Sequence, residues 1–201
     1  MNVNYQNILE CTIKQIGDTK PKLLLHSCCA PCSSYVLEYL SSIFDITIFY
    51  YNPNIHPESE FKFRSEEQKK LVEKMGLESC VKVVNCEYDS EEFYKAVQGL
   101  ENCPEGGERC AKCFELRLNK SAKYAKNNGF DYFTTTLTIS PHKNSGLLNE
   151  IGGKIAEANG IKYLFSDFKK KNGYKRSCEI SSLYGLYRQD YCGCVFSKNN
   201  K

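Results

Sequence analysis

Short apolar segments alternate along the chain with longer amphipathic segments, and this alternation limits the possible folds most strongly. Five short segments rich in branched or aromatic side chains predict strands. They are Lys22–His26, Asp45–Tyr51, Val81–Asn85, Phe130–Thr136 and Lys162–Phe165. Strands that are joined through helices pair in parallel by right-handed crossovers. The sequence therefore predicts an α/β fold with three layers, in which a mostly parallel sheet of about five strands lies between helices.

The amphipathic segments between these strands carry helix-end signals. Three long ones predict helices, and a glycine follows each of them directly. They span Pro57–Met75, Glu108–Asn128 and Asn144–Asn159. Pro31 is suited to the first turn of a further helix. Asp89 and Glu92 form the pattern of a capping box, which predicts another helix start.

The length and hydropathy of the chain favour one domain without a membrane span. A chain of 201 residues can bury a core of its own. Apolar runs stay shorter than the roughly 18 residues that a transmembrane helix needs, and Met1–Cys11 does not resemble a signal peptide. We expect a cytoplasmic protein with an N-terminal extension, residues 1–21, and a single domain, residues 22–201, which includes a cysteine-bearing C-terminal segment.

Seven of the twelve cysteines fall in three tight groups. One group directly follows the first predicted strand, one starts a predicted helix, and one lies near the C-terminus around Gly193. Open α/β folds place their chemistry beyond the carboxyl ends of the strands, and clustered thiolates need a cation to offset their repulsion. We therefore expect a metal centre, with these ligands: Cys28, Cys29, Cys32, Cys110, Cys113, Cys192 and Cys194.

The spacing of the cysteines does not decide between zinc and an iron–sulfur cluster. Cys110 and Cys113 have the spacing of a zinc knuckle. Seven thiols exceed what one zinc or one cubane cluster needs, which indicates a cluster with a second metal or with a redox disulfide. The remaining cysteines are isolated, and we expect them to be small buried hydrophobic residues. They are Cys11, Cys80, Cys86, Cys103 and Cys178.

Two other functions fit parts of this pattern. An ATP-dependent thiolase or sulfurtransferase would need a glycine-rich phosphate loop after the first strand, but that loop holds Cys28, Cys29 and Cys32 and no glycine. A zinc-stabilised RNA-binding module without catalysis would use the same thiols. The colour after anaerobic purification distinguishes this second alternative from an iron–sulfur enzyme, because an iron–sulfur protein is brown and a zinc protein is colourless.

Six segments of the chain resemble the QueH-type epoxyqueuosine reductases. They are HSCCAPC (His26–Cys32), YNPNIHP (Tyr51–Pro57), PEGGERCAKCFELRL (Pro104–Leu118), FDYFTTTLTISPHKN (Phe130–Asn144), DFKKK (Asp167–Lys171) and YRQDYCGC (Tyr187–Cys194). The resemblance runs from about Lys22 to Ser197 and includes all seven clustered cysteines. Residues 1–21 lie outside it.

The resemblance implies a Rossmann-like domain related to the adenine-nucleotide α-hydrolase and HUP superfamily. It implies a 4Fe–4S cluster, an adjacent mononuclear iron and no cobalamin. It also implies an activity, the two-electron reductive removal of the epoxide oxygen of epoxyqueuosine at the wobble position of tRNA, which gives queuosine. The partners would be the anticodon loop of that tRNA and an external low-potential electron donor.

The metal ligands are expected to form two sets. Cys110 and Cys113, together with cysteines of the other two groups, would hold the cluster. The remaining thiolates and Asp190 would hold the second iron. This division follows from the expected convergence of the three groups and from the surplus of thiols over one cluster.

Removal of an epoxide oxygen also needs protons and a group that polarises the C–O bond. Asp190 directly precedes the last cysteine group and is expected to act as an iron ligand or proton donor; the alternative is an exposed carboxylate paired with Arg188. His142 and His56 follow predicted strands and are expected to be catalytic. His26 ends the first strand and is expected only to orient the cysteine loop.

A basic stretch, Lys162–Arg176, contrasts with an acidic middle of the chain. Residues 142–176 carry 8 basic and 3 acidic side chains, whereas residues 58–105 carry 7 basic and 12 acidic ones. Such a run is most often a solvated surface, but this one follows a strand and contains aromatic rings that can hold an unstacked base. We expect it to bind anticodon-loop phosphates through Lys169, Lys170, Lys171, Lys175 and Arg176.

Overall fold

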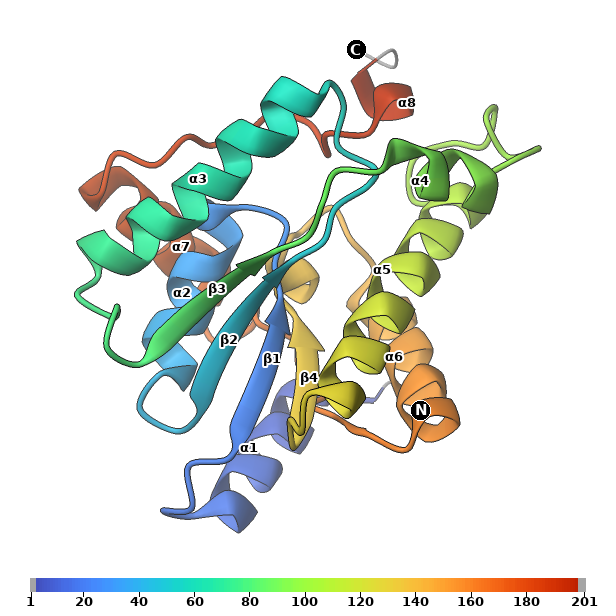
Figure 1. The fold of residues 1–201 in the computed structure, drawn as a ribbon. Helices are drawn as coiled ribbons and strands as arrows, with labels where there is room; N and C mark the ends of the chain where they lie inside the picture. Colours follow the sequence, from blue (N-terminus) through green and yellow to red (C-terminus); the bar gives the residue numbers. More distant parts are fainter. Residues whose placement is uncertain (1–2, 199–201) are drawn as a thin grey trace.

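The computed structural model describes residues 3–198 and contains one sheet of five strands (Figure 1). All neighbouring strands are parallel, in the order β3–β2–β1–β4–β5. The prediction of a mostly parallel, five-stranded α/β fold is therefore confirmed. The strands are β1 (Lys22–His26), β2 (Asp45–Tyr50), β3 (Val81–Asn85), β4 (Tyr132–Thr135) and β5 (Lys162–Tyr163).

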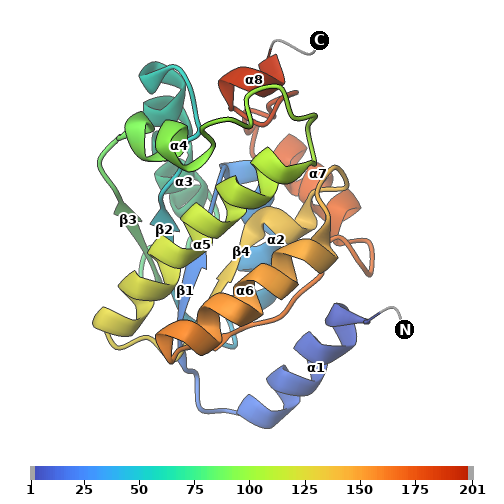
Figure 2. The ribbon, with the colours of Figure 1, turned by 90° about the vertical axis from the view of Figure 1, so that its right-hand side faces the viewer.

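Helices cover both faces of this sheet (Figure 2). Helices α2 (Ala30–Leu40), α3 (Glu58–Lys74) and α7 (Gly173–Leu183) lie on one face, and α5 (Glu108–Asn127) and α6 (Ser145–Asn159) lie on the other. Three short elements lie near the carboxyl ends of the strands, which point upward in Figure 1. They are α4 (Ser90–Ala96), the 3-10 helix η1 (Thr136–Ile139) and α8 (Val195–Lys198).

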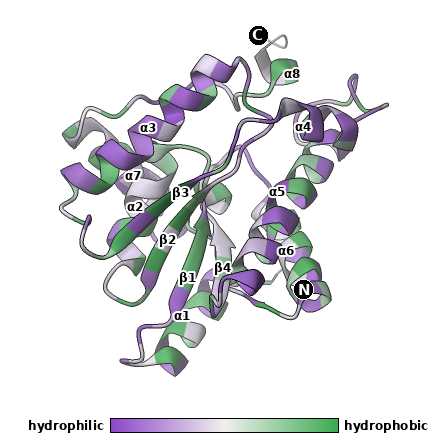
Figure 3. Cartoon of the chain, in the orientation of Figure 1, coloured by the Kyte–Doolittle hydropathy of each residue, from purple (hydrophilic) through white to green (hydrophobic). Residues whose placement is uncertain are grey.

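The alternation of side chains in β1 explains why the sheet needs helices on both faces. Leu23 and Leu25 belong to a core shared with α2 and α3, whereas Leu24 belongs to a second core shared with α5 and α6. All three side chains are fully buried. Strands β1 and β2 are accordingly hydrophobic over most of their length in Figure 3. A parallel strand that is buried on both faces reads as a continuous apolar run, as this one does.

The N-terminal extension contains a helix, α1 (Tyr5–Ile16), that the sequence analysis did not predict. Its Leu9 is fully buried in the same core as Leu23 and Leu25. The extension therefore packs against the domain that follows it. The outer ends of the two predicted ranges, residues 1–2 and 199–201, lie outside the part of the chain that the structure describes.

Several predicted boundaries differ from the structure. Strand β4 ends at Thr135, because the next residues form η1, and β5 holds only two residues. Asp89 caps α4 by accepting a hydrogen bond from the backbone of Glu91 at 2.9 Å. Glu92 does not complete the predicted capping box, because its carboxylate instead accepts hydrogen bonds from Tyr51 and Lys120.

The loops that follow the strands gather at one edge of the sheet. The cysteine loop follows β1, residues 51–57 follow β2, and η1 follows β4. In Figure 1 the C-terminal segment runs past this edge to α8. Across residues 3–198, none of the helices combines the length and the apolar character needed to cross a bilayer.

Candidate metal centre and cavity

All three cysteine groups meet at the carboxyl edge of the sheet, as predicted, and line two adjoining cavities. Cys28, Cys29, Cys32 and Cys192 line a cavity of about 530 Å³. A much smaller cavity of about 40 Å³ is lined by four cysteines, and Cys192 is common to both. The four are Cys110, Cys113, Cys192 and Cys194. The seven thiols thus form one continuous region with two parts.

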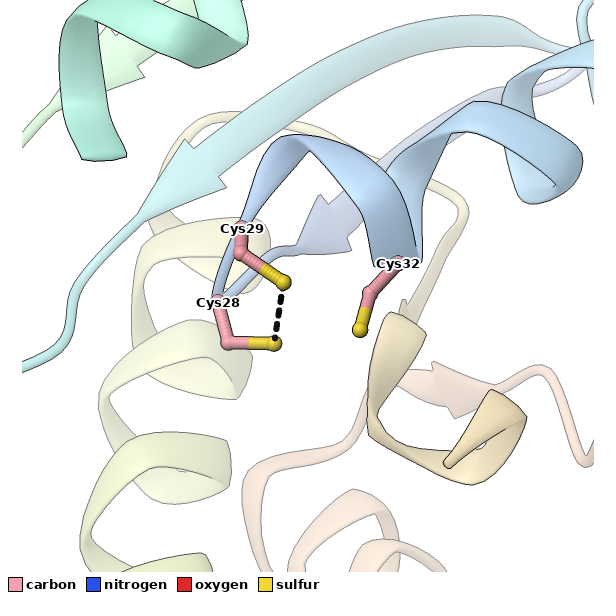
Figure 4. Close-up of side chains that lie close together, drawn as sticks. All are labelled: Cys28, Cys29 and Cys32. Atoms are coloured by element: carbon pink, nitrogen blue, oxygen red, sulfur yellow. Dashed lines mark hydrogen bonds between the residues drawn. The ribbon is translucent and has the colours of Figure 1, made fainter. Parts of the chain in front are cut away.

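The first part is a compact group of three thiols at the N-terminus of α2 (Figure 4). The sulfur atoms of Cys28, Cys29 and Cys32 all lie within 4.8 Å of one another, and those of Cys28 and Cys29 are 3.6 Å apart. Across a single tetrahedral ion, bonds of about 2.3 Å would place two sulfurs about 3.8 Å apart. The spacing therefore suits ligands of one metal ion.

Short-range hydrogen bonds fix the loop that carries these thiols. Cys29 is the N-cap of α2, and its carbonyl accepts from the backbone of Ser33 at 3.2 Å. The hydroxyls of Ser27 and Ser33 are 2.6 Å apart, and the Asn52 amide donates to the Ser27 carbonyl at 2.8 Å. All these groups are buried. The sequence around residues 26–33 therefore positions the first three thiols largely by itself.

The three thiols differ in pKa. Hydrogen bonds from Cys29 and Cys32, with help from nearby positive charges, hold the pKa of Cys28 well below its usual range. The same contacts raise the pKa of Cys29 to about 12 and raise that of Cys32. The N-terminus of a helix also favours a thiolate. One thiol of the group is thus prepared to be the first anionic ligand of a cation.

The second part of the region begins in the first turns of α5. The backbone N–H of Gly106 donates to the Cys110 sulfur at 3.2 Å. Buried Arg109 donates to the carbonyls of Glu101 at 2.7 Å and of Cys103, which fastens the preceding loop to the helix. Burial raises the pKa of Cys110 and raises that of Cys113 to about 12. Without a metal these two thiols are therefore protonated.

The C-terminal segment completes this part through long-range contacts. The Gly193 carbonyl accepts from the backbone N–H of His56 at 2.9 Å, and the Cys192 carbonyl accepts from Arg64 at 3.3 Å. Gly193 has a φ of 99°, and an added Cβ would lie 3.1 Å from Ile55 and from the Arg64 guanidinium. A glycine is therefore required between Cys192 and Cys194, both by backbone conformation and by space.

A buried cation, Arg117, contacts the second part of the thiol region. Its side chain is 1% exposed, and it donates to the Asn52 carbonyl oxygen at 2.6 Å and to the Cys113 sulfur at 3.9 Å. Its Nε lies 3.3 Å from the His26 ring. Burial, and then Arg117 itself, lowers the pKa of His26 to about 3, so the imidazole is neutral. The positive charge of Arg117 thus has uncharged groups and thiols as its neighbours.

A second cation, Lys143, faces the region from the segment after η1. It lines both cavities and is only partly exposed. Cys192, followed by Cys28 and Cys32, raises the pKa of Lys143 through the negative charge that each of these cysteines carries when it is ionised. The lysine therefore remains protonated and contributes a positive charge to the cavity wall.

The structure places the three predicted catalytic residues differently. Asp190 lines the large cavity together with Cys28, Cys29 and Cys32, and His142 lines both cavities. His56 lines neither cavity, and its backbone N–H contacts the C-terminal segment; like Asp190 and His142, it has an exposed side chain. His26 is fully buried, with Nδ1 2.8 Å from the Thr135 hydroxyl.

The predicted tRNA-binding side chains line neither cavity and lie on α7 or just before it, and Tyr174 and Ser177 of α7 line the larger cavity. Three of the five are already in ion pairs. Lys169 pairs with Asp167 at 2.6 Å, Lys171 with Glu10 at 2.5 Å, and Arg176 with Glu38 at 2.6 Å. Within residues 3–198, Lys170 and Lys175 form no ion pair and are exposed.

The five isolated cysteines lie away from the two cavities among the described residues. Cys80 and Cys86 are partly buried against the two cores, and Cys103 and Cys178 are also partly exposed. Cys11 is exposed, so the expectation of a buried residue is wrong for this position. Its helix turns this side chain away from the core that contains Leu9 and Ile16.

Sequence reasoning missed three basic residues of the site: Arg64, Arg117 and Lys143. Arg117 could have been found, because it lies four residues after Cys113 and thus on the same face of the helix. Lys143 follows the predicted catalytic residue His142 directly. Arg64 lies in a charged helix without a nearby motif, so no local signal distinguishes it.

The donor set suits a thiolate-bound metal centre. Seven thiols converge, and three of them lie at the spacing of ligands to one ion. Buried Arg117 has as neighbours thiols that would be anionic once ionised. A buried charge is tolerated only with compensation. Protonated thiols give Arg117 no negative counter-charge, whereas metal-bound thiolates would supply one. These residues therefore fit an anionic iron–sulfur centre.

Comparison with known proteins gives one consistent result. The chain matches the family described as "Epoxyqueuosine reductase QueH" over residues 23–200. It is 46% identical to the epoxyqueuosine reductase QueH of Staphylococcus epidermidis, over 97% of this chain and 84% of that protein. The protein of that name from Streptococcus pyogenes is 44% identical, over 97% of this chain and 78% of its own length. The Thermotoga maritima protein of that name is 38% identical, over 87% and 89%.

Proposed function

The chain belongs to the epoxyqueuosine reductase QueH family of oxidoreductases, and from this premise we propose that it reduces epoxyqueuosine in tRNA to queuosine. Two electrons and two protons would convert the epoxide to an alkene and release its oxygen as water. The observation that carries this proposal is the convergence of seven thiols on two cavities, the larger of which is also lined by the ionisable side chains of Asp190 and His142. A cytoplasmic location suits a tRNA substrate.

The thiols are proposed to hold two metal groups. Cys110, Cys113, Cys192 and Cys194 surround the small cavity and would hold a 4Fe–4S cluster, each through a different iron. The three closely spaced thiols, Cys28, Cys29 and Cys32, would hold the mononuclear iron, with Asp190 as an oxygen ligand from the same cavity. The first group of cysteines then serves the second iron rather than the cluster.

The iron–sulfur cofactor would supply electrons one at a time at low potential, delivered by an external donor and without cobalamin. The chain's own residues bind and orient the substrate and handle protons. The cavity of about 530 Å³ falls in the usual range for sites that hold a small molecule or a flipped-out base. His142 lines it and is proposed to deliver protons, and Asp190, which also lines it, is the alternative donor if it does not bind the iron.

The anticodon loop is proposed to approach over α7. Tyr174 lines the cavity and is 38% exposed, so its ring can stack on a base that leaves the loop. Lys170 and Lys175 are exposed there and would contact phosphates directly, whereas Lys169, Lys171 and Arg176 would exchange a carboxylate partner for a phosphate. These three side chains therefore contribute less to the affinity for tRNA than side chains without a carboxylate partner would.

The test is anaerobic reconstitution with iron and sulfide, followed by reaction with epoxyqueuosine-containing tRNA and a chemical reductant. Nucleoside analysis by mass spectrometry should show queuosine, together with loss of its epoxide. The Cys178→Ser variant should react equally, because this thiol lies outside the two cavities. A fully reconstituted, reduced protein that binds this tRNA and leaves the epoxide intact would refute the proposed activity.

A further inference from the structure

Arg117 is the most completely buried charged side chain near the thiols. It lies on α5 four residues after Cys113, with 1% of its surface exposed. Its three nitrogens contact the His26 ring at 3.3 Å, the Cys113 sulfur at 3.9 Å and the Asn52 amide oxygen at 2.6 Å. The guanidinium is therefore held in one orientation from several sides, with one edge toward a proposed cluster ligand.

The surroundings of Arg117 contain no carboxylate partner. Among residues 3–198, the charged residues that form ion pairs do not include it. The groups that interact with its charge favourably are the thiols of Cys113, Cys28 and Cys192. They come from all three cysteine groups. The fold thus places one buried positive charge in contact with Cys113 and within electrostatic reach of the other two cysteine groups.

This arrangement differs from that of the other arginines near the site. Arg64 is also buried but has the carboxylate of Glu60 at 2.7 Å as its counterion. Arg109 donates to backbone carbonyls and stacks on the Phe196 ring at 4.8 Å. Arg117 alone of these three depends on thiolates for compensation. A charge in such a position cannot be screened by solvent and acts strongly on its neighbours.

We propose that Arg117 is the counter-cation of the thiolate centre and that it raises the reduction potential of the cluster. The inference rests on the proposed function, because it requires the cluster. Reduction adds one electron to a centre that is already anionic. A fixed positive charge at hydrogen-bonding distance from Cys113 stabilises the more negative, reduced form. Arg117 is thus a positioning and electrostatic residue and does not contact substrate.

The test compares four variants by potentiometric titration of the anaerobically reconstituted protein, followed by visible absorption and electron paramagnetic resonance. Arg117→Gln and Arg117→Met remove the charge and keep part of the volume. Arg117→Lys keeps the charge. Lys112→Met is the matched control, because Lys112 lies beside Cys113 on the same helix but is exposed and paired with Glu115 at 2.9 Å.

The expected result is a shift of the midpoint potential to more negative values in the two neutral variants. The midpoint potential of Arg117→Lys should stay close to that of the wild type, and that of Lys112→Met should be unchanged. Neutral variants that keep the cluster and the wild-type potential would overturn the proposal. Loss of the cluster from both neutral variants, with retention in Arg117→Lys, would support the requirement for charge; loss from all three Arg117 variants would overturn it.

The outcome for Arg117 can be separated from that of the proposed function. A wild-type protein that takes up zinc and no sulfide would refute the cofactor and with it the premise of the titration. A wild-type protein with a reducible cluster but no reaction with tRNA would refute the activity and leave the effect of Arg117 measurable. The potential does not depend on substrate, so the two results are independent.

Discussion

The two parts of the thiol region are built in different ways. Cys28, Cys29 and Cys32 come from five consecutive residues, and hydrogen bonds within residues 26–33 and to Asn52 hold them. The four thiols around the small cavity come from α5 and from the C-terminal segment, about 80 residues apart in the chain. His56 and Arg64 hold the C-terminal segment, and Arg109 of α5 stacks on its Phe196.

This difference predicts different responses to damage. The first part keeps its geometry as long as β1 and α2 are folded, since both are anchored in the core. The second part requires the C-terminal segment to be docked, and burial raises the pKa values of Cys110, Cys113 and Cys194, so these three thiols are protonated without a metal. Metal binding and docking of the segment are therefore coupled for the second part, as expected when a site is completed by its ligand.

The largest effect is expected from Cys113→Ala. This substitution removes a proposed cluster ligand and the sulfur that accepts from Arg117. We expect loss of the brown colour, of bound sulfide and of activity after reconstitution. Cys110→Ala should behave alike. The matched controls are Cys80→Ala and Cys178→Ser, which should keep colour and activity, and a colourless Cys178→Ser protein would contradict the assignment of ligands.

Cys28→Ala tests whether the two parts are separate. It removes one thiol of the compact group and none of the four around the small cavity. Activity should fall to background, while the cluster spectrum should persist and the iron content should drop by about one per chain. Loss of the cluster spectrum in this variant would show that the two parts form one centre.

Asp190→Asn should keep both the cluster and its colour and lose about a hundredfold in turnover. The amide has nearly the same shape but cannot donate a carboxylic proton or bind iron as an anion. Single-turnover kinetics with saturating tRNA measure the change. Gln189→Ala is the control, since Gln189 lines the same cavity without an ionisable group. Wild-type turnover by Asp190→Asn would remove this residue from the mechanism.

The smallest effect is expected from replacing Lys169, Lys170 and Lys171 together by alanine. The apparent Kd for tRNA should rise a few-fold, because two of these lysines are already paired with carboxylates. The log–log slope of binding against salt should flatten by about 0.7 for each lost phosphate contact. Glu91→Gln with Lys95→Gln, an exposed pair on α4, is the control. An unchanged slope would place the tRNA elsewhere.

Features that depend on residues close together in the sequence could be predicted, whereas features that depend on distant contacts could not. Strand β1 was predicted to the residue, because three leucines buried on alternate faces form a continuous apolar run. Helix α7 was not predicted, since it starts at Gly173 after Asn172, which has a φ of 64°, and no capping side chain marks it. Strand β5 was predicted too long, because only Lys162 and Tyr163 pair with β4.

The site shows the same limit. The seven cysteines could be identified because clustered thiols are rare in a chain without disulfides, and the order of strands placed them at one edge. The division of these cysteines into a group of three and a group of four could not be predicted, because it depends on how the C-terminal segment docks against residues 55–64. The ion pairs of Lys171 with Glu10 and of Arg176 with Glu38 could not be predicted either, because α1 and α2 supply the carboxylates from distant sequence.

The most direct test of the central claim is the iron and acid-labile sulfide content of the anaerobically reconstituted wild-type protein and of Cys28→Ala, measured on the same preparation. The account predicts about five irons and four sulfides per chain in the wild type, and about four of each in the variant. A wild-type protein that holds zinc without sulfide, or a variant that loses all its sulfide, would contradict two separate thiolate sites on this fold.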